Sequence, residues 1–97
     1  MNRLRFHSGA RAEFRESALF YEGELRGLGA EFVAEVERTI EFVVTHPNAG
    51  SPLWGDFRRT LVRRFPFAVI YRVRDETVYV VAIAHQRRRP NYWRSRG

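Results

Sequence analysis

The sequence predicts an α+β domain, with a helical hairpin packed on one face of a mostly antiparallel four-stranded sheet. Two amphipathic helical patterns occupy the first half of the chain, one short alternating run precedes them, and three strand-like runs follow them. This order, β-α-α-β-β-β, is typical of a helical layer on a sheet. At 97 residues there is room for a single domain, residues 1–97, around one core.

The N-terminal strand and the first helix are predicted from two different periodicities. Residues 3–7 alternate, with Leu4 and Phe6 on one side, as a half-buried strand does. Ser8 is then the expected N-cap of a helix. That helix has one apolar stripe with spacings of three and four residues, made of Ala10, Phe14, Ala18, Tyr21 and Leu25.

A second helix is predicted after a short turn at residues 27–29, where two glycines flank a leucine. It ends at His46-Pro47, because the residue before proline disfavours helical geometry. So short a turn predicts an antiparallel helical hairpin. The inward positions of the second helix are expected to be Phe32, Val33, Val36, Ile40, Val43 and Val44.

The rest of the sheet is predicted from three runs near the C-terminus. A loop at residues 48–57, which contains Gly, Pro and Asp, leads into strands at residues 58–65, 67–74 and 77–85. A tight connection at residues 75–76 joins the last two. Both alternating sets of the final strand are apolar, which indicates a central strand or a second face covered by something outside the domain.

Charge is divided unequally between the two halves. Residues 1–50 hold six Arg and eight Glu, a net charge of −2, whereas residues 51–97 hold eleven Arg and three acidic residues, a net charge of +8. We therefore expect an acidic partner to dock on the basic sheet and tail. All seventeen basic residues are arginine, which cannot act as a general base near neutral pH. A catalytic base would have to be a histidine, a carboxylate or a tyrosine.

Several classes of protein are disfavoured by composition. The chain has no cysteine, so disulfides and thiolate metal sites are excluded. The three histidines (His7, His46 and His85) are far apart and lack an acidic ligand pattern, so we expect no metal and no cofactor. The first residues lack the apolar core of a signal peptide, and no run approaches about 20 apolar residues. We expect a cytoplasmic protein.

Six short motifs occur in one order along nearly the whole chain. They are A-x-x-E-F-x-E-S-A-x-x-Y-E at 10–22, G-L-G at 27–29, T-H-P-N-A-G at 45–50, R-R-F-P-F at 63–67, V-I-Y-R-V at 69–73 and A-H-Q-R-R-x-P-x-Y-W at 84–93. In this order the chain resembles the RelE/ParE superfamily, the toxin half of type II toxin–antitoxin systems. The resemblance implies a growth inhibitor neutralised by a cognate antitoxin, in a hetero-oligomer with it.

Within that superfamily the resemblance favours the ParE-like branch, which binds DNA gyrase and lacks nuclease activity. The nuclease branch typically has an arginine at the start of the third strand, where this chain has Ala68. It also often has lysines on the preceding strand, and here Leu61 stands at one such position. The alternative is a ribosome-dependent mRNA endoribonuclease of the RelE type. A plain basic nucleic-acid-binding domain is a third possibility.

The resemblance and the charge pattern together nominate site residues. Under the ParE-like interpretation no catalytic residue is assigned. The nuclease alternative would use Arg63, Arg64, His85, Arg88 and Tyr92. The expected target-binding residues are Arg63, Arg64, Arg87, Arg88 and Arg89. We expect the antitoxin, an acidic segment that folds on binding, to contact Phe14, Ala18, Tyr21, Arg58, Arg59, Arg63 and Arg64.

Two of the aromatic or imidazole groups also have a purely structural interpretation, which we favour. His85 would orient the C-terminal turn through a backbone hydrogen bond instead of acting as a base. Trp93, which follows Pro90 closely, would fold back and pack on the core instead of stacking on a nucleic acid base.

Overall fold

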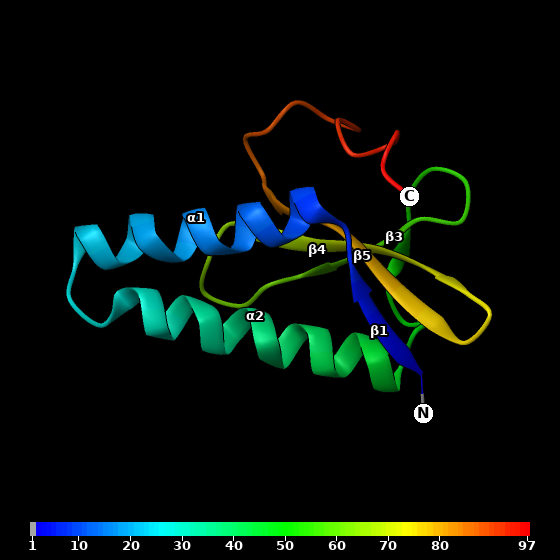
Figure 1. Cartoon of the computed structure of the whole chain (residues 1–97), viewed down its shortest axis with the longest axis horizontal. Helices are drawn as coiled ribbons and strands as arrows, with labels where there is room; N and C mark the ends of the chain where they lie inside the picture. Colours follow the sequence, from blue (N-terminus) through cyan, green and yellow to red (C-terminus); the bar gives the residue numbers. More distant parts are fainter. Residues whose placement is uncertain (1) are drawn as a thin grey trace.

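Two helices lie side by side across one face of a five-stranded sheet (Figure 1). The computed structural model describes residues 2–97. Its elements are β1 (Arg3–Phe6), α1 (Ser8–Glu24), α2 (Leu28–Thr45), β2 (Ser51–Pro52), β3 (Arg58–Leu61), β4 (Phe67–Arg74) and β5 (Thr77–His85). The predicted α+β class and helical hairpin are confirmed. The sheet has five strands instead of four, because the two-residue β2 pairs with the start of β3.

The strands are ordered β1-β5-β4-β3-β2, with β1 parallel to β5 and every other pair antiparallel. The final strand is therefore an inner strand, as its two apolar faces predicted. The tight connection between β4 and β5 consists of Asp75 and Glu76, with φ of 51° and 59°. Two successive residues with positive φ are what a two-residue hairpin of the right twist requires.

Three predicted boundaries are wrong, each for a local reason. The N-cap of α1 is His7, whose Nδ1 accepts the Gly9 N–H at 2.9 Å, so Ser8 is already helical and the first strand ends one residue early. The strand predicted over residues 58–65 ends at Leu61. Beyond it the chain must reverse into β4, and Arg64 adopts a left-handed φ of 70° in that turn.

The helical hairpin is closed by a carboxylate. Glu22, near the end of α1, accepts the N–H groups of Gly27 and Gly29 at 3.0–3.1 Å. These are N–H groups at the start of α2, where a negative charge is favourable. A Cβ on Gly29 would lie 2.6 Å from the carbonyl oxygen of Ala18, so glycine is needed for the two helices to approach this closely.

The sheet is buried on both faces, and the two faces have different covers. Against the helices lies the larger core, in which the rings of Phe32, Tyr21, Phe65 and Phe67 pack at 4.9–6.1 Å. On the opposite face a smaller core is covered by Trp93, which is 4% exposed; its other buried members are Phe57, Ala68, Ile70, Val81 and Ala82. Trp93 thus packs as predicted.

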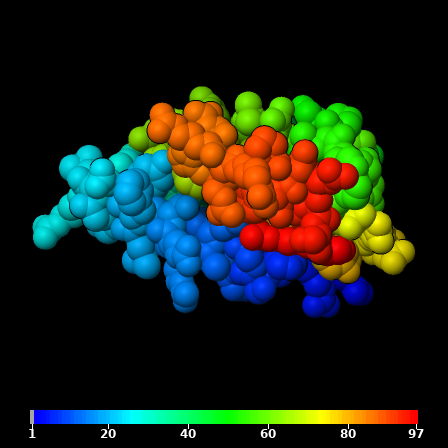
Figure 2. Space-filling model, turned by 90° about the horizontal axis from the view of Figure 1, so that it is seen from above, coloured from blue at the N-terminus to red at the C-terminus, as the bar shows by residue number. Residues whose placement is uncertain are grey.

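The segment that follows β5 lies across this second face and reaches back to α1. In the view from above, it forms the orange and red surface beside the blue start of α1 (Figure 2). The C-terminal segment, residues 86–97, is therefore a structural cover and not a loose tail. Neither described helix is long and apolar enough to cross a membrane.

The loop after α2 depends on one buried hydroxyl. Tyr71 of β4 is fully buried; its Oη donates to the Pro47 carbonyl at 2.8 Å and accepts the Gly50 N–H at 3.1 Å. We expect Tyr71→Phe to lower the free energy of unfolding by about 1–3 kcal/mol, because two loop backbone groups lose their partner. Urea denaturation measures this.

The matched control is Tyr79→Phe. Tyr79 is half-buried, and its hydroxyl makes no hydrogen bond within residues 2–97. Equal losses of stability in the two variants would show that the Tyr71 hydroxyl does not hold the loop.

Candidate target-binding groove

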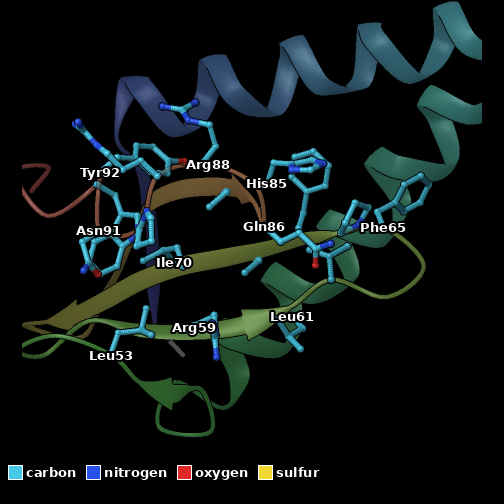
Figure 3. A pocket seen from close by; sticks show the side chains of 18 residues that line it. Leu53, Arg59, Leu61, Phe65, Ile70, His85, Gln86, Arg88, Asn91 and Tyr92 are labelled. Carbon is cyan, nitrogen blue, oxygen red and sulfur yellow. The ribbon is translucent and has the colours of Figure 1, made fainter.

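A groove of about 470 Å³ lies on the sheet face away from the helices, between the strands and the C-terminal segment (Figure 3). Three strands supply its floor, which is mostly apolar and includes Leu61, Ile70 and the small residues Ala68 and Ala84. Its cationic groups are Arg59 from β3 together with Arg88 and Arg89 from the C-terminal segment. No acidic side chain is among the described residues that line it. The groove therefore suits an anionic partner with apolar groups.

The wall of the groove is set by how the chain leaves β5. His85 Nδ1 accepts the Arg87 N–H at 3.0 Å, its carbonyl accepts the Arg88 N–H at 3.0 Å, and its ring packs edge-on to Phe67. Because Nδ1 is an acceptor here, the neutral ring carries its proton on Nε2. His85 thus has the structural arrangement that we favoured, and it orients the turn that begins the wall.

Tyr92, the other candidate proton carrier, is poorly suited to lose a proton. Burial, together with the neighbouring Glu13 carboxylate, raises the pKa of Tyr92 well above its ordinary value, against the opposing effects of Arg88 and Arg96. The Arg88 guanidinium stacks 4.0 Å from the centre of its ring. The Tyr92 hydroxyl therefore stays protonated near neutral pH and is not arranged as a ready general base. The same holds for His85, because its Nδ1 already accepts the Arg87 N–H.

Comparison with known proteins identifies the family. The family model described as the ParE toxin of the type II toxin–antitoxin system parDE matches residues 4–90. Toxin ParE2 of Mycobacterium tuberculosis, in two strains, is 31% identical over 93 residues, covering 92% of this chain and 86% of that protein. This chain belongs to the ParE toxin family.

Solved structures agree with the ParE fold. A chain of the chromosomal ParDE toxin–antitoxin system from P. aeruginosa superposes with a TM-score of 0.74 at 21% identity, over 88% of this chain and 96% of that chain. The isolated RelE toxin of E. coli gives a TM-score of 0.66 at 22% identity, over 98% of this chain and 95% of that one. Together with the family match, this likeness of fold confirms the superfamily resemblance seen in the sequence.

The arginines predicted to bind partners of this ParE-family chain fall into two groups. Arg64 forms ion pairs with Glu31 at 2.5 Å and with Glu35 at 3.7 Å, and Arg58 donates to the carbonyls of Gly50 and Asn48. Their own chain therefore holds these two guanidinium groups. Sequence spacing could not reveal the Arg64 pairs, because they join residues about thirty positions apart.

The other predicted arginines differ in their availability. Arg88 lies 3.7 Å from Glu13 and stacks on Tyr92, so it is partly engaged. Of the arginines predicted to bind a partner, four are exposed and have neither an ion pair nor a side-chain hydrogen bond within residues 2–97: Arg59, Arg63, Arg87 and Arg89. Arg59 and Arg89 line the groove, whereas Arg63 lines a second, mostly apolar hollow of about 250 Å³ between α2 and β3.

The helix residues predicted to contact an antitoxin lie mainly inward. Phe14, Ala18 and Tyr21 are half-buried and pack against the larger core, so their contact with a partner stays a prediction. The large apolar side chains that α1 and its C-cap present to solvent are instead Leu19, Phe20 and Leu25, each more than 60% exposed. Leu25 belonged to the predicted stripe, but α1 ends before it.

A further acidic group, Asp56, was missed by the sequence analysis, although it is one of only three acidic residues in the basic half. It binds Arg72 at 2.6 Å and Arg74 at 3.3 Å. These two guanidinium groups therefore belong to an internal cluster beside the loop before β3. Asp56 thus engages two arginines that composition alone would have assigned to a partner.

The Asp56 cluster predicts an acid-sensitive contribution to stability. Hydrogen bonding to Arg72, with further contributions from Arg72 and Arg74, lowers the pKa of Asp56 in the folded state. A group whose pKa is lower in the folded state stabilises the fold at pH values above its unfolded pKa, which is about 3.9 for Asp. That stabilisation is lost as the pH falls through the folded-state pKa. We expect Asp56→Asn to be modestly less stable than wild type at pH 7, by roughly 0–1 kcal/mol as for an exposed pair. The gap measured by urea denaturation should be smaller at pH 3 than at pH 7. A gap that is the same at both pH values would contradict it.

Proposed function

We propose that this protein is the growth-inhibiting toxin of a toxin–antitoxin module and that it binds DNA gyrase through the groove. The composition of the groove carries this proposal. Its cationic groups are arginines, its floor has Ala68 where a phosphate-binding cation would serve a nuclease, and neither His85 nor Tyr92 is arranged as a general base. Such a surface is suited to binding a partner and poorly suited to proton transfer.

Membership of the ParE family supports the same target. The sequence match covers residues 4–90, which includes all three strands that form the floor and the start of the wall. The likeness to E. coli RelE lies in the fold alone, at 22% identity. The family assignment and the groove chemistry thus favour binding over RNA cleavage.

A supercoiling assay with purified gyrase tests the target. We expect the wild-type protein to inhibit supercoiling. The Arg59→Glu/Arg89→Glu variant should need a concentration at least roughly tenfold higher for the same inhibition, because two groove cations are replaced by anions that repel an anionic partner. The control is Arg5→Glu/Arg26→Glu, which makes the same charge change at two exposed arginines outside the groove.

Two results would contradict the proposal. The first is unchanged supercoiling at a large excess of the wild-type protein. The second is cleavage of mRNA within codons in a cell-free translation extract that disappears in His85→Ala, because this would assign the protein to ribosome-dependent endoribonucleases.

We further propose that a cognate antitoxin neutralises the protein with an acidic segment that folds on binding. The chain has a net charge of +6, and the exposed Arg59, Arg63, Arg87 and Arg89 have no ion pair or side-chain hydrogen bond in residues 2–97, so an acidic segment would be attracted to it. Exposed apolar groups lie near these arginines: Leu61, 68% exposed, borders both Arg59 and Arg63. A P. aeruginosa structural relative is described as a ParDE toxin–antitoxin system.

Charge reversal tests the antitoxin surface. Arg59→Glu/Arg63→Glu should weaken the complex with the product of the adjacent gene by about two orders of magnitude, since two cations that meet acidic groups become repulsive. Isothermal titration calorimetry measures the affinity, and Arg58→Gln/Arg64→Gln, whose side chains are held internally, should change it far less. Unchanged affinity of the Arg59→Glu/Arg63→Glu protein would place the antitoxin elsewhere.

A further inference from the structure

The edge of β5 is covered by β1 along only part of its length. The parallel pairing joins Arg3–Phe6 to residues 77–80, and the His7 N–H then bonds the Val80 carbonyl. Beyond Val80, no strand in the described chain pairs with this edge of β5. Backbone groups on an uncovered inner strand need other partners, because unpaired buried N–H and C=O groups are costly.

Two charged side chains take the place of the missing strand. Glu13 Oε1, from α1, accepts the Ile83 N–H at 3.1 Å, and the Arg96 guanidinium donates to the Val81 carbonyl at 3.0 Å. Glu13 and Arg96 also pair with each other at 3.1 Å, with side chains only 12% and 19% exposed. Removing one partner of a mostly buried pair of this kind strongly destabilises the folded protein, because the other charge is left uncompensated.

The same carboxylate is linked to the wall of the groove. Arg88 lies 3.7 Å from Glu13, and the ring of Tyr92 lies 4.0 Å from the Arg88 guanidinium and 5.1 Å from that of Arg96. Residues 88–93, which make up most of the part of the C-terminal segment that lines the groove, lie between Arg88 and Arg96 in the chain. One side chain of α1 therefore fixes both ends of the wall.

Gly9 makes room for this arrangement. A Cβ at residue 9 would lie 2.5 Å from the Cζ atom of Arg96, so the guanidinium occupies the space over the first turn of α1 that only glycine leaves open. Glu16, which lies one turn beyond Glu13 on α1, is exposed and has no partner of this kind in residues 2–97. Glu13 is thus distinguished from the other acidic residues of α1 by its burial and by what it binds.

We propose that Glu13 is a positioning residue for the groove: it holds the C-terminal wall on the uncovered edge of β5 and so sets Arg88 and Arg89 opposite Arg59. The proposal rests on the proposed function only in taking the groove as the surface that meets the target. The geometry of the latch itself, meaning Glu13 with Arg88, Arg96 and the Ile83 N–H, is independent of which target that is.

Hydrogen exchange on the full chain tests the latch. In Glu13→Gln we expect the amides of Ile83, Arg94 and Arg96 to exchange about tenfold faster, while amides within α2 keep their rates, because opening is local. Gly9→Ala should give the same local pattern, since its methyl group displaces Arg96. Alanine also favours the helix, which offsets part of the stability lost with the Glu13–Arg96 pair. Glu16→Gln should match wild type throughout.

Growth inhibition in cells, which does not presuppose gyrase, tests the positioning role. Glu13→Gln and Gly9→Ala should each need roughly tenfold more folded protein for the same inhibition, compared at a growth temperature below the unfolding midpoint of each variant. Faster local exchange with undiminished inhibition would overturn the positioning role, and unchanged exchange in both variants would overturn the latch. If wild type inhibits growth but leaves gyrase untouched, the proposed target fails while this comparison still decides the role of Glu13.

Discussion

The structure depends on one constraint: its two central strands, β4 and β5, are apolar on both faces, and each face must be covered. The helical hairpin covers one face with the larger aromatic core. Residues 2–97 form no second layer of helices for the other face, so the C-terminal segment covers it through Trp93. Burial of an aromatic side chain of this size contributes about 3–5 kcal/mol, as judged from truncation to alanine. The C-terminal segment is therefore part of the fold.

That cover is narrower than the face beneath it, and the groove is the part that stays open. Trp93 covers the centre of the second face, while Ala68, Ala84 and Leu61 remain along the groove floor. Apolar packing and electrostatics have different roles here. Trp93 supplies most of the net stabilisation of the wall, since the desolvation cost of the mostly buried Glu13–Arg96 pair offsets much of its attraction. The charged contacts of Glu13 decide where that wall lies, because hydrogen bonds and ion pairs are directional and apolar contacts are not.

Local pattern was sufficient for the parts of the fold that repeat. The two helices and the strands β4 and β5 follow from periodicity, and the apolar character of both faces of β5 identified it as an inner strand. Features that depend on one distant residue were not accessible. The pairing of Arg64 with Glu31 and the binding of Glu13 to Ile83 join residues 33 and 70 positions apart. The sequence showed an excess of arginine, but its local pattern could not tell which guanidinium groups the chain itself would engage.

Sorting the arginines by their partners narrows how an antitoxin could neutralise this protein under the proposed function. Arg59 lines the groove and Arg63 lines the hollow beside α2, and Leu61 of β3 borders both. A segment that contacts both arginines must therefore cross β3 at Leu61, and in doing so it occupies one rim of the groove. Antitoxin and target would then compete for Arg59. Neutralisation would follow from occlusion of the groove and would need no change in the shape of the toxin, because the two partners cannot bind the same guanidinium at once.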